Sequence, residues 1–551
     1  MKKNLWIIFL ILAAVYLIPL GVRDFFSPDE TRYAEIGREM LVRNNWVTPY
    51  LNGVIYFEKP ILSYWLFAAS EKILGENNFA VRLPCALAAL LSALLIFLFS
   101  RRFSEGGKTE ATISAIIFLL IPLVFCLGTT ATTDPLLLLF LTAGMTAFYY
   151  AVHAEKKMQT VLYLFLFGLA AGAGFLTKGF LAFVLSALAI AAYLIWTRKF
   201  RELFLYPWLP LLTALLVILP WAIMIHREQP EFWNYFIYDE HIKRFLAKEQ
   251  HPQPFWFFIP IYLGGFGFFL LYLPQAVRGL KTRCIKNDFY LYNLCWIVFP
   301  FLFLSASSGK LATYILPCFA PASILFGAGI QRDMLEDGHT LWYDRITKIF
   351  AILLIIAAAL LAVIQIWNPF WAPFSKEECW KWILILIAAL TASALFFLSA
   401  SRKNIQEKLL YFCAAPILVY FLFPFIIPDL FMLNKSACRL LETIKPKLPE
   451  NALILSFRYP FQDVCWVLKR DDILMYQAGG ELKKGLELMK RTDRILSIAQ
   501  TNELIRKEKS KRDIILIVPD YIYHEEKNRL PLPKKIEKLR DPNSKFIALV
   551  F

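Results

Sequence analysis

The sequence lacks the short local motifs that mark common cofactor sites. None of its nine cysteines stands in a CxxC or CxxH spacing, so no zinc knuckle is predicted. No HExxH motif is present, and GKLATY (309–314) lacks the earlier glycine and the following Ser/Thr of a Walker A loop. Internal repeats and low-complexity segments are also missing. A repeat protein, a P-loop nucleotide-binding protein and an HExxH metalloprotease are therefore not indicated.

Charge is scarce as well. Only 19% of the 551 residues are charged, whereas 58% are hydrophobic. Soluble domains are usually about 45–50% apolar. Here the apolar residues form runs of roughly 17–25, long enough to cross the hydrocarbon of a bilayer as helices. The sequence predicts a mainly α, polytopic membrane protein, so we attribute its net charge of +16 to basic loops and contact with membrane lipids. No nucleic-acid partner is expected.

We expect about thirteen transmembrane helices. They lie near residues 5–22, 79–100, 112–126, 133–152, 160–175, 179–197, 203–225, 255–277, 289–306, 312–330, 346–367, 380–400 and 409–428. The first run follows Met-Lys-Lys and could be a signal peptide. However, it is long, and no small-residue cleavage site precedes the acidic stretch after it, so we predict a retained span.

The distribution of Lys and Arg predicts which face each loop occupies. If Lys2 and Lys3 are cytoplasmic, every second connection should be basic, and all six such connections are. The alternate short turns around 127–132, 174–178 and 307–311 hold two lysines between them, Lys178 and Lys310. Residues 23–78, residues 226–254 and everything after about 430 are therefore predicted to lie on the outer face, together with those two lysines.

The chain changes character near residue 430. We predict a transmembrane catalytic domain over 1–430 and a small α/β domain over 431–551. Strands are expected at 452–457, 472–477, 494–500, 513–522 and 545–551, with helices at 482–491 and 502–509. Cys438 and Cys465 lie in this tail. They could pair if it is extracytoplasmic, or both could be free thiols.

The first outer segment contains a helix start at Ser27-Pro28-Asp29-Glu30. Ser27 fits the N-cap, Pro28 the first helical position, and Glu30 at N3 completes a capping box. Apolar residues then recur at helical spacing, which predicts an amphipathic helix on the membrane surface with Glu35, Arg38 and Glu39 on its solvated face. The cap does not require Asp29, which could equally be structural or catalytic.

Other charged residues fall at outer ends of predicted helices. Glu58 and Lys59 precede an apolar helix over 61–74 and are surrounded by aromatic residues, and an interfacial charge of this kind is a functional candidate. His241 stands among acids and bases in YDEHIKRF (238–245) and could join Glu58 in binding a divalent ion, or could simply be hydrogen-bonded. Asp134, before Pro135, is as consistent with a helix cap as with a site.

Basic and phenolic groups occur at two further outer helix ends. Lys310 and Tyr314 are four residues apart, would share a helix face, and could hold a phosphate. A snorkelling lysine and an interfacial tyrosine explain them equally well. Lys178 has the same two explanations. Together, these groups would suit a negatively charged headgroup beside a hydrophobic tail.

Several of these segments resemble those of one enzyme family. SPDETRYAEIGREM, WVTPYLNGVIYFEKPILSYW, TTDP, FLTKG, EHIKRF and GKLATYILP are similar, in this order, to the membrane glycosyltransferases of the protein-mannosyltransferase type. Within that group they resemble the lipid A 4-amino-4-deoxy-L-arabinose transferases. One departure is Ala312, where the family pattern leads us to expect proline. The resemblance covers the membrane part throughout.

The resemblance implies a reaction and a location. Such an enzyme takes aminoarabinose from undecaprenyl phosphate and delivers it to a lipid A phosphate, which confers resistance to polymyxin. It would act, as a monomer, at the periplasmic face of the inner membrane of a Gram-negative cell. The active site and the C-terminal domain would both be periplasmic.

The resemblance also implies roles for individual residues. Asp29 and Asp134 match acidic residues at the reacting sugar, and Glu58 and His241 match ligands of a divalent metal, zinc in the family. The lipid phosphate would be bound by Lys59 and Tyr314, with Lys178, Arg244, Lys310 and Glu30 as further candidates for substrate binding.

Two alternatives remain open at the level of sequence. The same fold could transfer another polyprenyl-linked sugar, or use a protein hydroxyl as acceptor. A transporter of lipid-linked sugars is the alternative of another class. It should show inverted repeats and polar residues at mid-membrane, whereas the predicted spans here are almost free of charge.

Overall fold

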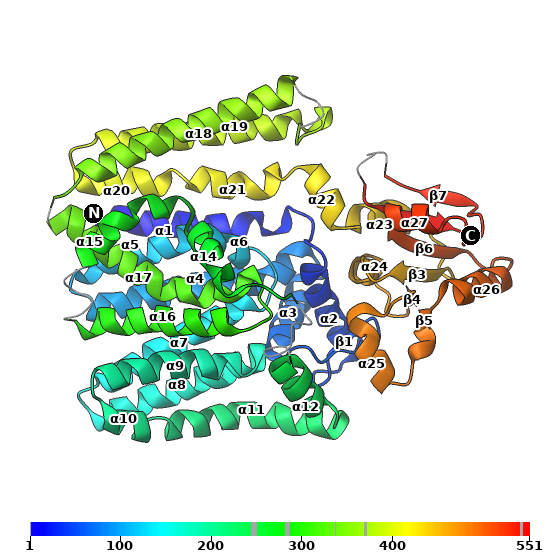
Figure 1. Cartoon of the computed structure of the whole chain (residues 1–551), viewed down its shortest axis with the longest axis horizontal. Coiled ribbons are helices and arrows are strands. Elements are labelled where there is room, and N and C mark those ends of the chain that lie inside the picture. Colours follow the sequence, from blue (N-terminus) through cyan, green and yellow to red (C-terminus); the bar gives the residue numbers. More distant parts are fainter. Residues whose placement is uncertain (1, 244–250, 281–286, 337, 368–371, 540–543) are drawn as a thin grey trace.

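The computed structural model describes residues 2–243, 251–280, 287–336, 338–367, 372–539 and 544–551. Long helices form a bundle as far as Ile426, and a small domain built on a β-sheet follows at one end of it (Figure 1). The helix α22 (Asp429–Lys435) lies between the two parts.

Ten helical segments among the described residues are long and apolar enough to cross a membrane. They are Asn78–Phe103, Asp134–Val152, Lys157–Lys178, Phe200–Glu228, Phe255–Leu280, Asp288–Ala306, Ala312–Leu335, Leu341–Trp367, Lys376–Ser401 and Ile405–Ile426. Gly107–Leu120 and Pro122–Gly128 form a pair bent by 64°, and Ile7–Gly21 and Leu181–Trp196 are shorter apolar helices. Every predicted span thus coincides with an apolar helix, but the count of thirteen is not confirmed, because three of these segments are bent or short.

The bundle helices carry the labels of Figure 1. They are α1 (Lys2–Leu17), α4 (Asn78–Phe103), α5 (Gly107–Leu120), α6 (Pro122–Gly128), α7 (Asp134–Val152), α8 (Lys157–Lys178), α9 (Leu181–Trp196), α10 (Phe200–Leu205), α11 (Trp208–Glu228), α14 (Phe258–Phe266), α15 (Leu273–Leu280), α16 (Asp288–Ala306), α17 (Phe319–Ile330), α18 (Leu341–Trp367), α19 (Cys379–Ser401), α20 (Ile405–Ala414) and α21 (Ile417–Ile426).

The first helix belongs to the core of the bundle. Leu12 and Tyr16 of α1 are fully buried, and the Tyr16 hydroxyl donates to the Leu119 carbonyl oxygen at 2.8 Å. By contrast, α18 and α19 form a hairpin along one edge (Figure 1), and α18 leaves large side chains such as Leu353 and Leu360 about half exposed. An apolar surface of this length is stable only against lipid, which agrees with a multi-pass membrane protein.

The first outer segment folds between the bundle and the sheet domain (Figure 1). It contains α2 (Asp29–Arg43), a two-stranded ribbon of β1 (Tyr50–Leu51) and β2 (Val54–Ile55), and α3 (Leu62–Leu74). The predicted capping box is wrong: α2 starts at Asp29, Pro28 stands at its N-cap without a side-chain cap, and the Ser27 hydroxyl donates to Asp463 instead.

The predicted solvated face of α2 is also wrong. Glu35 and Glu39 are 0% and 1% exposed, and Arg38, which is 5% exposed, pairs with Glu35. The apolar periodicity of α2 does not predict this, because the charged face is covered by the C-terminal domain and by the β1–β2 turn, whose Gly53 amide donates to Glu39 at 2.9 Å. Arg43 of α2 forms an ion pair with Asp471 of that domain.

The C-terminal domain has a six-stranded sheet in the order β5-β4-β3-β6-β8-β7. The strands are β3 (Leu453–Phe457), β4 (Leu474–Tyr476), β5 (Ile495–Leu496), β6 (Ile514–Pro519), β7 (Lys535–Glu537) and β8 (Phe546–Val550). β3 to β6 pair in parallel, and β8 is antiparallel to both of its neighbours. The accompanying helices are α23 (Cys438–Ile444), α24 (Phe461–Leu468), α25 (Lys483–Leu488), α26 (Ile498–Glu508) and α27 (Asp520–Glu526).

All five predicted strands are present, although 494–500 is strand only at β5 and then enters α26. β7, α23, α24 and α27 were not predicted, because β7 is short and exposed and the three helices have only about two turns each. Cys438 and Cys465 are both buried free thiols, which answers the question of a disulfide.

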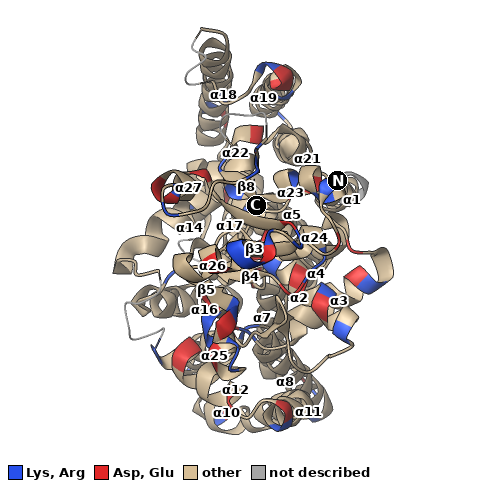
Figure 2. Ribbon diagram, turned by 90° about the vertical axis from the view of Figure 1, so that its right-hand side faces the viewer, with Lys and Arg blue, Asp and Glu red and all other residues tan. Residues whose placement is uncertain are grey.

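The two ends of the bundle differ as the topology requires. The N-terminus and α10 lie at the end opposite the sheet domain (Figure 1). Viewed from the sheet-domain end, acidic and basic residues are intermingled over α2, α3 and α25 (Figure 2). The predicted outer charges therefore gather at the end that carries the C-terminal domain.

Candidate active site

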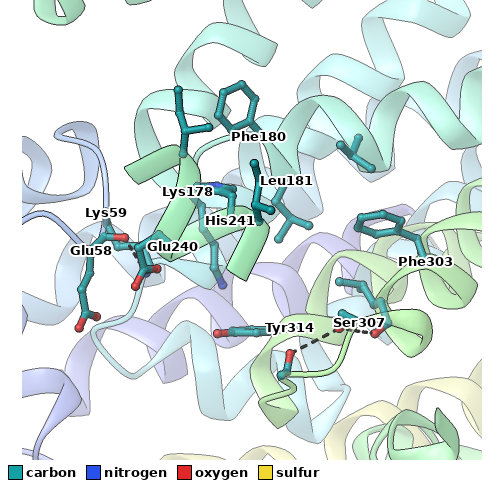
Figure 3. A pocket seen from close by; sticks show the side chains of 15 residues that line it. Glu58, Lys59, Lys178, Phe180, Leu181, Glu240, His241, Phe303, Ser307 and Tyr314 are labelled. Atoms are coloured by element: carbon teal, nitrogen blue, oxygen red, sulfur yellow. Dashed lines mark hydrogen bonds and ion pairs between the residues drawn. The ribbon is translucent and has the colours of Figure 1, made fainter. Parts of the chain in front are cut away.

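A cavity of about 540 Å³ opens at this end of the bundle. One part of its lining is apolar and includes Phe180, Leu181, Val184, Phe303 and Leu304. The other part is polar and carries Glu58, Lys59, Lys178, Glu240, His241 and Tyr314 (Figure 3). Six side chains from four separate stretches of sequence thus surround one space.

Lys59 is held at the edge of this cavity by two oxygens. Its Nζ donates to Oε2 of Glu240 at 3.1 Å and to the backbone carbonyl of Glu58 at 2.8 Å. The Lys59 side chain is 15% exposed, so its ammonium group keeps contact with the cavity. Glu240 lies on η2 (Tyr235–Lys243), a stretch of π-helix in the long outer loop.

Lys178 enters the cavity from the last turn of α8. Its Nζ forms an ion pair with Asp134 at the start of α7 and lies 4.3 Å from the centroid of the Tyr314 ring (Figure 3). Both side chains of the ion pair are only 7% exposed. Asp134 does not line the described cavity, so its contact with the site passes through Lys178.

Asp29 stands apart from this cavity at the first residue of α2. Its side chain is 59% exposed and accepts from Nη1 of Arg32 at 3.0 Å. Burial raises the pKa of the nearby Tyr33, the charge of Arg32 opposes this, and the charges of Asp29, Asp134 and Glu58 add to the rise. Three acids from three different segments therefore act on the same phenol, although Asp29 itself does not line the cavity.

Glu58 and His241 both line the cavity, but they do not point at a common place. Figure 3 shows the Glu58 carboxylate directed away from the imidazole. Burial, and then the charge of Glu240, raises the pKa of Glu58. The His241 Nδ1 lies 2.7 Å from the Phe236 carbonyl oxygen, which can only accept, so Nδ1 carries the proton and Nε2 is the nitrogen suited to a metal.

A complete metal site needs at least three ligating side chains around one point. Within the described ranges, no three His, Cys, Asp or Glu side chains are grouped as ligands. His241 has the backbone hydrogen bond that is common in ligating histidines, but Glu58 would have to turn toward it. In this arrangement His241 is suited to bind a divalent ion, but the surrounding side chains do not complete its set of ligands.

Glu30 has a structural environment. It is fully buried, binds Arg82 at 2.7 Å and Arg23, and accepts from the Ala131 amide at 3.0 Å. Burial alone would raise its pKa, but the two guanidinium groups dominate and lower it to about 2. Its carboxylate is satisfied by these contacts and does not line the cavity, so the structure gives no support to a substrate-binding role.

Lys310 does not share a helix face with Tyr314, contrary to the sequence prediction. The 3₁₀ segment η5 (Ala312–Cys318) begins only after Lys310. The Lys310 Nζ donates to the carbonyl oxygens of Gln253, at 2.9 Å, and Ser307. Lys310 is 3% exposed and therefore ties two outer loops together. Arg244, the other predicted helper, lies outside the described residues.

Sequence reasoning missed two participants. Glu240 pairs with Lys59, yet in the sequence it looks no different from Asp239 beside it. Glu481 of the C-terminal domain lies with Oε2 2.9 Å from Nε of Arg32 and accepts from the Tyr56 hydroxyl at 3.0 Å. No local signal identifies Glu481, because its partners are hundreds of residues away in the chain.

Two family models match parts of the chain. The model described as dolichyl-phosphate-mannose-protein mannosyltransferase matches residues 3–236. The model of the arabinosyl transferase ArnT, C-terminal domain, matches residues 432–547.

Curated relatives match almost the whole chain, and each of the two described here is named undecaprenyl phosphate-alpha-4-amino-4-deoxy-L-arabinose arabinosyl transferase. The protein from Shewanella sediminis is 35% identical over 512 residues, which cover 92% of each chain. The protein from Erwinia tasmaniensis is 36% identical over 529 residues, which cover 95% of this chain and 94% of the relative.

A solved structure has the same fold. ArnT from Cupriavidus metallidurans bound to undecaprenyl phosphate superposes with a TM-score of 0.85 at 20% identity, covering 100% of this chain and 98% of that one. The apo state of the same protein gives a TM-score of 0.82. The agreement in fold extends over both the bundle and the sheet domain.

Proposed function

The chain belongs to the family of undecaprenyl phosphate-aminoarabinose arabinosyl transferases, and we propose that it transfers 4-amino-4-deoxy-L-arabinose from undecaprenyl phosphate to a phosphate of lipid A. The observation that carries this proposal is the cavity itself. Its apolar wall suits a polyprenyl chain, while Lys59 and Lys178 stand at its polar end, where the phosphate of such a lipid would lie.

The chemistry follows from where charge develops. The bond between the anomeric carbon and the donor phosphate oxygen breaks, and the same carbon bonds to an oxygen of the acceptor phosphate. The leaving undecaprenyl phosphate gains negative charge, which Lys59 and Lys178 would stabilise; stabilisation of developing charge is usually the largest catalytic contribution. Tyr314, whose ring lies 4.3 Å from the Lys178 Nζ, would help to hold that phosphate.

The acceptor decides what Asp29 has to do. A phosphate acceptor is already an anion and needs no general base, so Asp29 would orient the sugar, bind its amine or stabilise positive charge at the anomeric carbon. With a hydroxyl acceptor, Asp29 would instead remove the proton. Asp29 does not line the cavity, so in this proposal the bound substrate, or a movement of the outer loops, would bring it to the sugar. Asp134 would act by orienting Lys178.

We also propose that the site takes a divalent ion, zinc by resemblance, on Nε2 of His241 with a carboxylate from Glu58. Such an ion would supply positive charge to the phosphate oxygens. The proposal stands on the His241 hydrogen bond to Phe236 and requires the Glu58 side chain to turn.

The location proposed for the enzyme is the inner membrane of a Gram-negative cell, with the cavity and the C-terminal domain on the periplasmic side. The support is the alternation of basic loops, because Lys and Arg favour cytoplasmic connections. We propose, from the resemblance, that the enzyme acts as a monomer.

Transfer by the purified protein tests the function. Undecaprenyl phosphate-aminoarabinose and lipid A are incubated with the full chain in detergent, and lipid A is examined by mass spectrometry. We expect a mass increase of one aminopentose, greatly reduced in Asp29→Asn. If wild-type protein binds the donor but leaves lipid A unmodified, the proposed acceptor is wrong. A modified peptide would favour the protein-hydroxyl alternative. Unchanged transfer by Asp29→Asn would remove Asp29 from the mechanism.

A further inference from the structure

A second cavity, of about 440 Å³, adjoins the first on the side of the C-terminal domain. The bundle and the outer loops contribute Glu58, Tyr235, Asp239, Glu240 and Lys243, and the C-terminal domain contributes Gly480, Glu481, Lys483, Lys484 and Glu487. Its lining is polar, unlike that of the first cavity. Glu58 and Glu240 line both spaces, so the two cavities meet at these residues.

Three of the five acids that line this second cavity have a cationic partner. Glu240 accepts from Lys59 at 3.1 Å, and Glu481 lies 2.9 Å from the Arg32 guanidinium. Glu487 lies 4.0 Å from Nζ of Lys483, at the longest distance that still counts as an ion pair. The negative charge of the wall is therefore partly neutralised, by Lys59 and Arg32, which do not line this cavity, and by Lys483, which does. The other two acids are Asp239 and Glu58, and burial and the charge of Glu240 raise the pKa of Glu58.

The two lysines at the start of α25, Lys483 and Lys484, are available to bind an anion. The Lys483 side chain is 71% exposed and its ion pair is long. Lys484, the next residue, is exposed. The part of the chain that the structure describes shows no side-chain hydrogen bond or ion pair for it. Lysine acts as a compact, mobile point charge that binds phosphate without fixed geometry.

Group transfer imposes a further requirement. Two substrates must meet at one carbon, so their sites must be adjacent and must share a boundary. If the apolar cavity holds the donor lipid phosphate, the neighbouring polar cavity is the space from which an acceptor reaches the sugar. A phosphorylated headgroup matches its polarity and its size, and its three lysines, two of them from α25, could bind a phosphate.

We propose that the second cavity receives the phosphorylated headgroup of the acceptor lipid, and that Lys483 and Lys484 of the C-terminal domain bind its phosphate. This inference rests on the proposed function, because it takes the first cavity as the donor site. It makes the C-terminal domain part of the acceptor site, and it separates the determinants of the two substrates: α8 and the first outer segment for the donor, α25 for the acceptor.

Two-substrate kinetics tests the assignment. The double variant Lys483→Ala/Lys484→Ala is compared with wild type in full-length protein, with lipid A varied at saturating donor and the donor varied at saturating lipid A. Loss of two exposed charge-assisted contacts should raise the KM for lipid A about tenfold. The KM for the donor and the binding of undecaprenyl phosphate should stay unchanged.

A matched control is available on the same domain. Lys507→Ala/Lys509→Ala removes the same charge from exposed positions on and directly after α26, which do not line either cavity. It should leave both KM values unchanged. Lys484→Arg should retain most of the affinity for lipid A, and added salt should weaken acceptor binding more in wild type than in the double variant.

The outcomes separate this inference from the proposed function. Active wild-type enzyme with an unchanged KM for lipid A in the double variant would overturn the inference alone. If the double variant instead raises the KM for the donor, the second cavity belongs to the donor sugar. If inorganic phosphate competes with the donor but not with lipid A, the acceptor assignment is also wrong. Absence of any transfer by wild type would contradict the proposed function itself.

Discussion

Nε of Arg32 lies 2.9 Å from Oε2 of Glu481, and this ion pair joins the first outer segment to the C-terminal domain. The same guanidinium donates to Asp29 at 3.0 Å. The Arg32 side chain is 15% exposed, so the contact is well shielded from water. The C-terminal domain is therefore two contacts away from the carboxylate that the resemblance places at the reacting sugar.

We expect Glu481→Gln to lower kcat about tenfold, a loss in the range of one charge-assisted hydrogen bond. Neutral glutamine keeps the shape but releases Arg32, which then no longer fixes Asp29. The donor KM should change little, because Lys59 and Lys178 do not contact Glu481. Glu481→Asp, which keeps the charge, should restore part of kcat. A variant that unfolds earlier but turns over normally would show that the ion pair has only a structural role.

Lys178 and Asp134 form a buried pair, and breaking it should cost stability as well as activity. Lys178→Met leaves the Asp134 carboxylate buried without its partner, which costs about 3–5 kcal/mol for a buried ion pair. We expect a clear loss in unfolding temperature in detergent, together with loss of transfer.

The double variant Lys178→Met/Asp134→Leu separates these two effects. It removes both charges and should recover most of the stability while remaining inactive. Recovery of transfer in the double variant would contradict a role for Lys178 in binding the donor phosphate.

Lys59→Ala should weaken binding of undecaprenyl phosphate. The ammonium group is one of two cations at the polar end of the first cavity, and its removal also leaves Glu240 without the 3.1 Å contact. A charge-assisted contact corresponds to a loss of about tenfold in Kd or more. Lys72→Ala, at an exposed position of α3, is the control and should bind normally. Identical titration curves for Lys59→Ala and wild type would reject the assignment.

The pKa of Glu30 predicts how stability depends on pH. Because the folded-state pKa is lowered from 4.5 to about 2, the ionised carboxylate contributes stability above the unfolded pKa, and that contribution is lost as pH falls from about 4.5 toward 2. A shift of this size corresponds to roughly 3 kcal/mol.

Thermal unfolding between pH 5 and pH 2 measures this contribution. We expect wild type to lose stability over the interval. Glu30→Gln, which lacks the carboxylate at every pH, should start lower and change less. Parallel curves for the two proteins would show that Glu30 does not titrate in this window.

Elemental analysis tests the proposed metal. Wild-type protein purified without chelator should contain a divalent ion, and His241→Ala should contain much less, since a lost ligand typically lowers affinity strongly. His251→Ala, in the same outer loop, is the control. Equal metal content in wild type and His241→Ala would reject His241 as a ligand, whatever the effect on transfer.

The membrane part was largely predictable, because the signal is local. A span needs a continuous apolar run, and that run is visible whatever the helix packs against. The same holds for β3, β6 and β8, whose apolar residues follow one another in a buried sheet. Short elements such as β7 and α24 were not predicted, because they contain too few residues to show a clear strand or helix periodicity.

The candidate site was predictable only in part. Glu58, Lys59, Lys178, His241 and Tyr314 do line one cavity, as proximity on one face of a membrane protein suggests. Lys310 has a similar local setting at a helix end, yet its ammonium group donates hydrogen bonds to two backbone carbonyl oxygens. Sequence alone cannot separate these cases, because a lysine at a helix end has the same neighbours in the chain whether it meets a ligand or a loop.

By itself, the sequence determined the number of apolar stretches, the order of the outer segments and the strand–helix alternation of the tail, since each of these depends on residues adjacent in the chain. Only the tertiary structure decided which charges are buried and which partners they have. Glu35 and Glu39 became buried because the C-terminal domain and the turn between β1 and β2 cover α2. Arg32 pairs with Glu481 because the fold brings α2 against the segment just before α25. Electrostatic partners are set by distance in space, and that distance is not encoded in any local pattern.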